Sequence, residues 1–194
     1  MFDRQAGRRR QIIDAVASCV SEEGMAAVTL RNIARRIGAT TGMLTHYYEN
    51  RTALLKDAST AADHTFRARI AERAEAQPGF GWLCAFFEES FAPTDPEALP
   101  WAFWLEYWAS AERDAELGRH SISRLDALRR DVEHCVQKCV DDGTFRSDLD
   151  VPVAAQTIVA FMHGLGVELA IRHTPIDTCS RAAFRALLDG FRAA

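Results

Sequence analysis

The sequence of 194 residues lacks several features that would assign it to common protein classes. Its five cysteines form no CxxC pair and no even-numbered framework, which argues against a disulfide scaffold and suits a reducing compartment. No run approaches eighteen consecutive apolar residues, because even residues 158–171 include His163 and Glu168. The basic N-terminus is followed by an amphipathic segment rather than by the apolar core of a secretion signal. We therefore expect a folded, cytoplasmic protein.

Recognisable catalytic motifs are also lacking, since there is no HExxH, GxSxG, P-loop or Rossmann glycine pattern. His120, His134, Cys135 and Cys139 could suggest a metal site, because positions 135 and 139 share one helix face. Apolar neighbours such as Val132 favour core packing for these cysteines instead. The sequence thus predicts no catalytic residue, cofactor or metal. A helical thiol- or metal-dependent enzyme and a protein-interaction module stay as alternatives.

The alternation of apolar and polar residues that is typical of strands is absent, and apolar residues recur instead at helical spacing. An all-α protein with nine helices and short links is predicted. The expected helices cover residues 8–23, 29–38, 40–47, 52–76, 80–91, 101–108, 116–142, 152–172 and 177–192, with breaks at residues 77–79 and 93–96. Two short helices meeting across Gly38 suggest a helix-turn-helix. We expect a helix-turn-helix domain over residues 1–52 and a second helical domain over residues 53–194.

The net charge of −4 is unevenly distributed along the chain. Residues 1–56 contain nine Lys and Arg against five Asp and Glu, a net +4, whereas residues 57–194 have a net charge of −8. A basic N-terminal part joined to an acidic remainder indicates that only the first part meets a polyanion such as DNA.

Residues 29–55, TLRNIARRIGATTGMLTHYYENRTALL, contain an ordered set of motifs. The set comprises Ile33-Ala34, Gly38, Thr40, Gly42, Tyr47-Tyr48, Arg51 and Leu54-Leu55. This order resembles the TetR family of transcriptional regulators. The segments RRRQIIDA, GMLTHYY and WLEYWAS also resemble the choline-responsive BetI subgroup. The resemblance implies a ligand-responsive repressor that binds a palindromic operator as a homodimer and is released by a small molecule such as a choline-like compound. It also implies that residues 1–52 form the DNA-binding domain and residues 53–194 the effector-binding and dimerisation domain.

A recognition helix in the major groove needs short side chains at its first turn, so that its backbone can approach the bases. Thr41, Gly42 and Met43 meet this need, and Thr45 and His46 are placed to reach base edges. Tyr48 is expected to pack in the core. The predicted DNA-binding residues are Arg8, Arg9, Arg10, Arg31, Thr40, Thr41, Gly42, Met43, Thr45, His46, Tyr47 and Arg51.

The second domain is rich in aromatic residues, whose faces attract quaternary ammonium ions. The predicted effector-binding residues are Phe86, Trp101, Trp104, Tyr107, Trp108 and His163. The same spacing also fits core or dimer packing of the rings. A dimer is expected because one short recognition helix reads too few bases for selective binding. Its predicted interface lies on the last two helices, at Ile158, Met162, Leu165, Leu169, Phe184 and Leu188.

Overall fold

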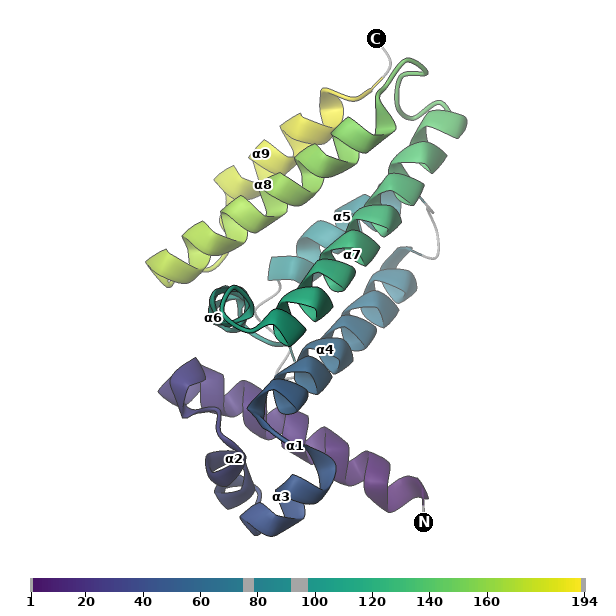
Figure 1. The fold of residues 1–194 in the computed structure, drawn as a ribbon. Helices are drawn as coiled ribbons and strands as arrows, with labels where there is room; N and C mark the ends of the chain where they lie inside the picture. The colour runs from purple at the N-terminus through teal and green to yellow at the C-terminus, as the bar shows by residue number, and fades with distance from the viewer. Residues whose placement is uncertain (1, 75–78, 92–97, 193–194) are drawn as a thin grey trace. The chain divides into compact units, whose positions relative to one another are not determined.

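The computed structural model describes residues 2–74, 79–91 and 98–192, with side chains in the first helix from residue 7 onward. This part of the chain contains nine α-helices and no strand, as predicted (Figure 1). The helices are α1 (Phe2–Glu23), α2 (Leu30–Arg36), α3 (Thr41–Tyr47), α4 (Arg51–Ala74), α5 (Phe80–Phe91), α6 (Trp101–Ala111), α7 (Ala115–Asp141), α8 (Val151–Arg172) and α9 (Thr178–Asp189), with a 3-10 turn η1 (Met25–Ala27) after α1. Of the two predicted breaks, residues 77–78 and 93–96 lie outside the described residues.

Several helix ends differ from the sequence prediction, and α6, for example, ends at Ala111 rather than at residue 108. Helix α1 begins at Phe2, ahead of the predicted start at residue 8, and α9 ends at Asp189 rather than at residue 192. Beyond α9, Arg192 forms an isolated bridge with Phe145. The backbone N–H of Arg146 donates to the carbonyl of Phe191 at 3.0 Å. The chain leaves the helix there because its backbone pairs with the segment that follows α7.

Backbone contacts divide the chain into two compact units. The first unit comprises residues 1–65 and 95–121, and the second comprises residues 66–94 and 122–194. Helices α4 and α7 each contribute residues to both units. The functional boundary expected between residues 52 and 53 stays a prediction.

The first unit is built on one apolar core shared by α1, α2, α3, the start of α4, and α6. Ile12, Ile33, Leu44 and Leu54 are fully buried there. Helix α6 packs against α1 and η1, and its residue Phe103 belongs to the same core. The helix that carries most of the predicted effector residues is therefore packed together with the predicted DNA-binding helices.

The second unit contains α5, α8, α9 and the distal parts of α4 and α7. Helices α8 and α9 lie side by side (Figure 1), and α5 contacts α8. The rings of Phe87 and Phe184 stack at 4.3 Å between centroids, which joins α5 to α9. By length and mean hydropathy, α8 is the one described helix that could cross a membrane. Packing inside the unit accounts for much of its apolar character, since Ala155, Ile158 and Met162 are buried.

Candidate nucleic-acid interface

The turn between α2 and α3 is held by side-chain caps at both helix starts. The Oγ1 of Thr29 accepts a hydrogen bond from the backbone N–H of Asn32 at 3.1 Å, and the Oγ1 of Thr40 accepts from that of Met43 at 3.2 Å. Between the helices, Gly38 adopts φ 65°, a left-handed conformation that glycine tolerates best. The two predicted caps and the glycine turn are thus present in the structure.

Helix α3 separates its inner and outer residues sharply. Leu44 is fully buried, and Tyr48, directly after the helix, is 6% exposed in the core, as the sequence predicts. Thr41, Thr45 and His46 are exposed to solvent. The polar residues expected to reach base edges therefore share the solvent face of α3.

Gly42 lies in the first turn of α3, and no contact within the protein requires a glycine there. A Cβ atom at this position would meet only the Oγ1 of Thr40, at 3.9 Å, which is an ordinary van der Waals distance. Alanine would also favour the helix more than glycine does. The missing side chain thus leaves an open backbone surface without serving the internal packing.

The basic residues near this face differ in what they contact. Arg31 is exposed in the first turn of α2. Arg8 donates from Nη1 to the Oε1 of Gln11 at 2.6 Å, whereas Arg9 donates from Nε to the Oδ2 of Asp57 at 2.8 Å. Arg10 is exposed on the same helix. In the arginine run of α1, the guanidinium of Arg9 is thus ion-paired within the protein.

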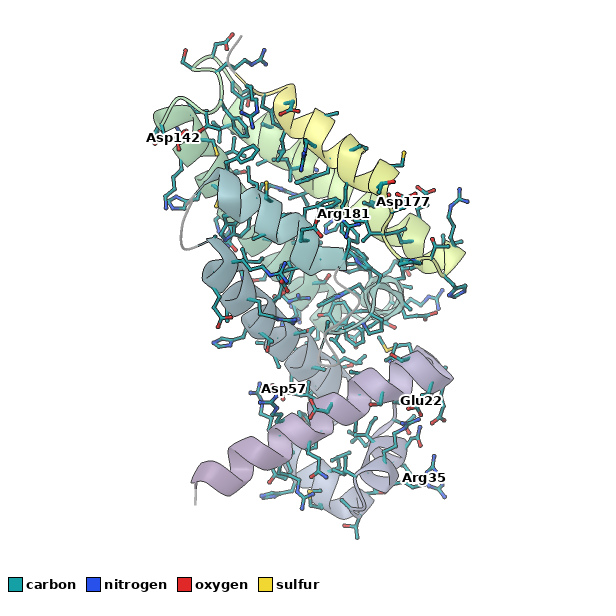
Figure 2. The ribbon with its side chains drawn as sticks, turned by 180° about the vertical axis from the view of Figure 1, so that it is seen from behind. Glu22, Arg35, Asp57, Asp142, Asp177 and Arg181 are labelled. Carbon is teal, nitrogen blue, oxygen red and sulfur yellow. The ribbon has the colours of Figure 1, made fainter. Side chains whose placement is uncertain are left out.

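Asp57 links three elements of the first unit, and its position on α4 beside α1 is visible in Figure 2. Its Oδ2 accepts from the hydroxyl of Tyr48 at 2.6 Å as well as from Arg9. Burial alone would raise the pKa of the Asp57 carboxyl, but the hydrogen bonds from Arg9 and Tyr48 hold that pKa below its usual value. Burial, together with this carboxylate, also raises the pKa of the Tyr48 hydroxyl. The sequence analysis did not identify Asp57.

Arg51 points into the protein. Its Nε donates to the carbonyl of Val28 at 2.9 Å and its Nη2 to the carbonyl of Met25 at 3.1 Å. Burial lowers the pKa of this guanidinium. Two donors of Arg51 therefore satisfy carbonyls at η1, and its predicted phosphate contact stays a prediction.

The predicted effector residues fall into both units. Trp101, Trp104 and Trp108 are half-buried on α6, and the ring centroids of both Trp101 and Trp104 lie 6.3 Å from that of Trp108. Tyr107 is fully buried in the first unit, and its hydroxyl lies 2.7 Å from the Nδ1 of His120. A single site made of the whole set stays a prediction.

The two remaining members of the predicted effector set belong to the second unit. Phe86 is 2% exposed and stacks on Trp82 at 5.4 Å. Burial lowers the pKa of His163, which favours a neutral ring. Phe86 is thus a core residue of that unit, whereas His163 is half-buried in it.

The predicted dimer interface on α8 and α9 stays a prediction, but four of its six residues are buried within the single chain. Ile158, Met162, Phe184 and Leu188 are each at most 4% exposed within the single chain, so they form the core of the second unit rather than its surface. Their helical spacing marks an apolar face, but α5, α8 and α9 cover that face among themselves. Leu165 and Leu169 keep partial exposure. The large apolar side chains most exposed on α8 are Val153 at 59% and Ile171 at 68%.

The candidate metal ligands are not grouped in the described part of the chain. Within residues 2–74, 79–91 and 98–192, no three His, Cys, Asp or Glu residues are placed to hold a metal ion. Burial raises the pKa of Cys135 to about 11 and that of Cys139 to about 12. Both thiols are thus protonated at neutral pH, which suits core residues.

Comparisons with known proteins match both parts of the chain. Residues 12–58 match the family "Bacterial regulatory proteins, tetR family", and residues 81–193 match "BetI-type transcriptional repressor, C-terminal". The HTH-type transcriptional regulator BetI of Cronobacter sakazakii is 34% identical over 178 residues, which cover 88% of this chain and 83% of that protein.

Solved structures share the fold at lower identity. A transcriptional regulator from Pseudomonas aeruginosa PAO1 matches with a TM-score of 0.78 at 24% identity, covering 96% of this chain and 90% of its own. A regulator from Saccharomonospora viridis, solved in complex with choline, matches with a TM-score of 0.77 at 18% identity, covering 96% and 95%. The matches in both parts show that this chain belongs to the tetR family of bacterial regulatory proteins, as a helix-turn-helix transcriptional regulator with a BetI-type C-terminal part.

Proposed function

We propose that this regulator binds a palindromic operator as a homodimer, inserts α3 into the major groove, and releases DNA when a small cationic molecule binds. The observation that carries the proposal is the solvent face of α3, where Thr45 and His46 are exposed beside the open backbone at Gly42. Threonine and histidine side chains can hydrogen-bond to base edges while the helix backbone lies close to the DNA. The family is one of transcriptional regulators and not a class of enzymes.

The phosphate contacts in this proposal come from residues that surround α3. Arg31, Arg8 and Arg10 are placed at or near the solvent, and Tyr47 is half-buried at the end of α3. Such contacts set the register on the duplex and supply affinity that depends on salt. Arg51 is left out of this surface, because its guanidinium is engaged by η1 carbonyls. We assign Arg51 to stabilising the domain.

Fluorescence anisotropy with a labelled duplex from the gene's own upstream region tests DNA binding. We expect dissociation constants in the nanomolar to micromolar range, and weaker binding as salt rises. A scrambled duplex of equal length is the control for sequence-specific binding. Absence of any salt-sensitive binding would refute the proposal.

Dimerisation is proposed through the exposed faces of α8 and α9. Val153 and Ile171 are both exposed on α8, and Ala160 and Gly164 lie between them on exposed positions. Small residues flanked by large apolar ones allow a second helix to approach closely. A two-fold pair would place two α3 helices on successive major grooves, about 34 Å apart. Operator binding places the protein with the chromosome, in the cytoplasm.

A quaternary ammonium compound such as choline is the proposed effector. The three half-buried indoles of α6 offer aromatic faces that attract such cations. The BetI-type match and the choline bound to the Saccharomonospora viridis neighbour favour this class. Residues 53–194 would form the domain that receives the effector.

Contacts within the first unit suggest how α6 could transmit ligand binding. Helix α6 packs on α1 and η1, and the hydroxyl of its Tyr107 reaches His120 of α7, whose Nε2 lies 3.2 Å from the Oγ1 of Thr60 of α4. A ligand that favours a different position of α6 would therefore also displace the helices that support α3.

Isothermal titration with choline, betaine aldehyde and glycine betaine tests the effector. We expect heat on binding for the cationic compounds and a weaker protein–DNA complex in their presence. Trp104→Leu should reduce this heat, and operator affinity without ligand serves as the control that the variant is folded. No heat at millimolar concentrations of any of the three would overturn the choice of ligand class.

A further inference from the structure

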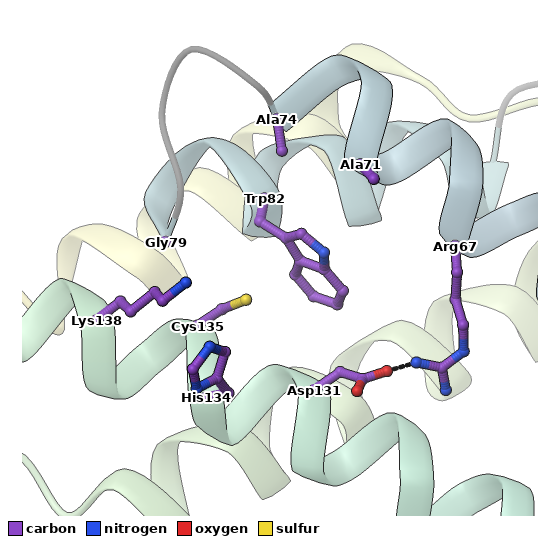
Figure 3. A pocket seen from close by; sticks show the side chains of 9 residues that line it. All are labelled: Arg67, Ala71, Ala74, Gly79, Trp82, Asp131, His134, Cys135 and Lys138. Carbon is purple, nitrogen blue, oxygen red and sulfur yellow. Dashed lines mark ion pairs between the residues drawn. The ribbon is translucent and has the colours of Figure 1, made fainter.

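A pocket of about 400 Å³ opens in the second unit between α4, α5 and α7, and none of the residues predicted to bind the effector lines it. Known small-molecule pockets span about 300–1,000 Å³, so a compound with a single ring system fits this volume. Its wall on α4 is made of small side chains, Ala71 and Ala74. Figure 3 shows the indole of Trp82 pointing into the space from α5. The pocket thus has enough volume for a ring and an aromatic surface that the ring can contact.

The backbone at Gly79 brings α5 close to α7 at one end of this pocket. Gly79 has φ 97°, and a Cβ atom there would lie 3.2 Å from the Sγ of Cys139 and 3.4 Å from the Cβ of Lys138. Only glycine allows both this conformation and this approach. The pocket's shape therefore depends on a residue that the chain cannot readily exchange.

One face of Trp82 is already covered, because it stacks on Phe86 with centroids 5.4 Å apart and planes 17° apart. This stacking fixes the indole orientation in the pocket. Cys135 also lines the pocket, and burial raises the pKa of its thiol to about 11. A protonated thiol behaves as a small apolar group. The interior beside Trp82 therefore suits a flat apolar ring.

The charged residues of the pocket have an asymmetric arrangement. Asp131 forms an ion pair with Arg67 at one end, so its carboxylate charge is already compensated (Figure 3). At the other end, the exposed His134 and Lys138 lie one turn apart on α7. The lining holds two permanent cations against one anion. This balance favours a negatively charged ligand over a cation.

We propose that this pocket is a second ligand site, which binds a small aromatic carboxylate with its ring against Trp82 and its carboxylate at Lys138 and His134. The site goes beyond the proposed function, because it differs in its residues and in ligand charge from the quaternary ammonium site. Its occupancy requires neither DNA nor dimerisation.

Isothermal titration of the full chain with benzoate, benzamide and benzyltrimethylammonium tests the ligand class. Benzoate should bind at least about tenfold more tightly than neutral benzamide, since the amide oxygen can still accept a hydrogen bond but lacks the negative charge that strengthens the bond to Lys138. Benzyltrimethylammonium should bind more weakly still at this pocket. No heat with millimolar benzoate, or equal binding of benzoate and benzamide, would overturn the proposal.

Variants locate the binding within the molecule. Lys138→Gln should weaken benzoate binding about tenfold. Arg130→Gln removes the same charge from an exposed position on α7 outside the pocket and should leave binding unchanged. Ala71→Met places a larger side chain on the exposed wall of the pocket and should also weaken binding, without loss of helix propensity. Equal effects of Lys138→Gln and Arg130→Gln would show a non-specific charge effect and refute the site. Operator binding by the same variants is measured separately, so failure of DNA binding cannot be mistaken for failure of the pocket.

Discussion

At the scale of single residues, Asp57 connects parts of the first unit that are distant in the sequence. Its hydrogen bonds reach Tyr48, nine positions earlier, and Arg9, forty-eight positions earlier. Because Tyr48 directly follows α3 and Arg9 lies on α1, one carboxylate helps to position both the recognition helix and the arginine run. Under the proposed function, Asp57 would thus be a positioning residue for DNA binding.

Replacing Asp57 by Asn should lower the free energy of unfolding by about 1–2 kcal/mol at pH 7, since the ion pair with Arg9 is lost. The pKa of Asp57 is lowered by folding, so its contribution is complete above the unfolded pKa of about 4 and disappears as the pH falls through the folded value. The difference between wild type and variant should therefore shrink below pH 4. Urea unfolding at several pH values measures it, with the exposed Asp148→Asn as control. A difference that stays constant down to pH 3 would contradict this account.

Variants of two arginines should distinguish a structural role from a phosphate-binding role. Arg51→Gln is expected to lower the thermal midpoint, because the carbonyls of Val28 and Met25 lose their donors, while the salt dependence of DNA binding stays unchanged. Arg31→Gln is expected to keep the midpoint and to reduce the slope of log affinity against log salt by about one. Thermal melts and salt titrations of both variants provide the comparison. If Arg51→Gln instead reduces the slope of log affinity against log salt, the guanidinium of Arg51 contacts phosphate.

At the scale of elements, α3 combines a stabilising cap with a glycine that does not stabilise it. Thr40→Ala removes the cap on Met43 and should cost about 1 kcal/mol of stability. Gly42→Ala should leave stability unchanged or raise it by up to about 1 kcal/mol, because a Cβ atom has room there. The same change should weaken operator binding, since the helix backbone can no longer approach as closely. Thermal melts and anisotropy titrations measure the two effects, and undiminished DNA affinity in Gly42→Ala would argue against close approach at this turn.

The number and order of helices could be predicted from the sequence because apolar spacing, caps and glycine turns are local signals. Thr29, Gly38 and Thr40 act over three or four residues, and each occupies the place that was predicted. The partners of Arg9 and Arg51 could not be predicted, because they depend on segments brought together only by folding. An arginine that faces solvent and one that donates to buried carbonyls have the same charge and residue type, so the sequence does not distinguish them.

The predicted interface shows a second limit on sequence reasoning. An apolar face on α8 or α9 can be covered by another helix of the same chain or by a partner, and both cases have the same periodicity. For Ile158, Met162, Phe184 and Leu188 the covering helices belong to the chain itself. Val153 and Ile171 remain exposed on α8. Their exposure could not be predicted from the sequence, because it depends on how the folded unit packs.

At the scale of the whole molecule, dimerisation should depend on the exposed residues of α8. Ile171→Glu is expected to raise the dimer dissociation constant at least tenfold, because a carboxylate would be buried at the interface. Operator affinity should fall with it, since a monomer presents only one α3. Light scattering after gel filtration measures the mass. Ile122→Glu, which changes an isoleucine of similar exposure on α7, is the matched control and should remain dimeric. Equal behaviour of the two variants would place the interface elsewhere.

The ion pair between Arg9 and Asp57 also bears on how the regulator finds its operator. A phosphate can engage Arg9 only by displacing a carboxylate that already holds it, so binding at this residue is an exchange between two anions. The free energy gained when Arg9 binds DNA of random sequence is then smaller than for an arginine without an internal partner. Contacts with bases must contribute further binding energy before the exchange becomes favourable. If Arg9 contacts the operator as predicted, Asp57 would therefore shorten the time that the protein spends on each wrong site.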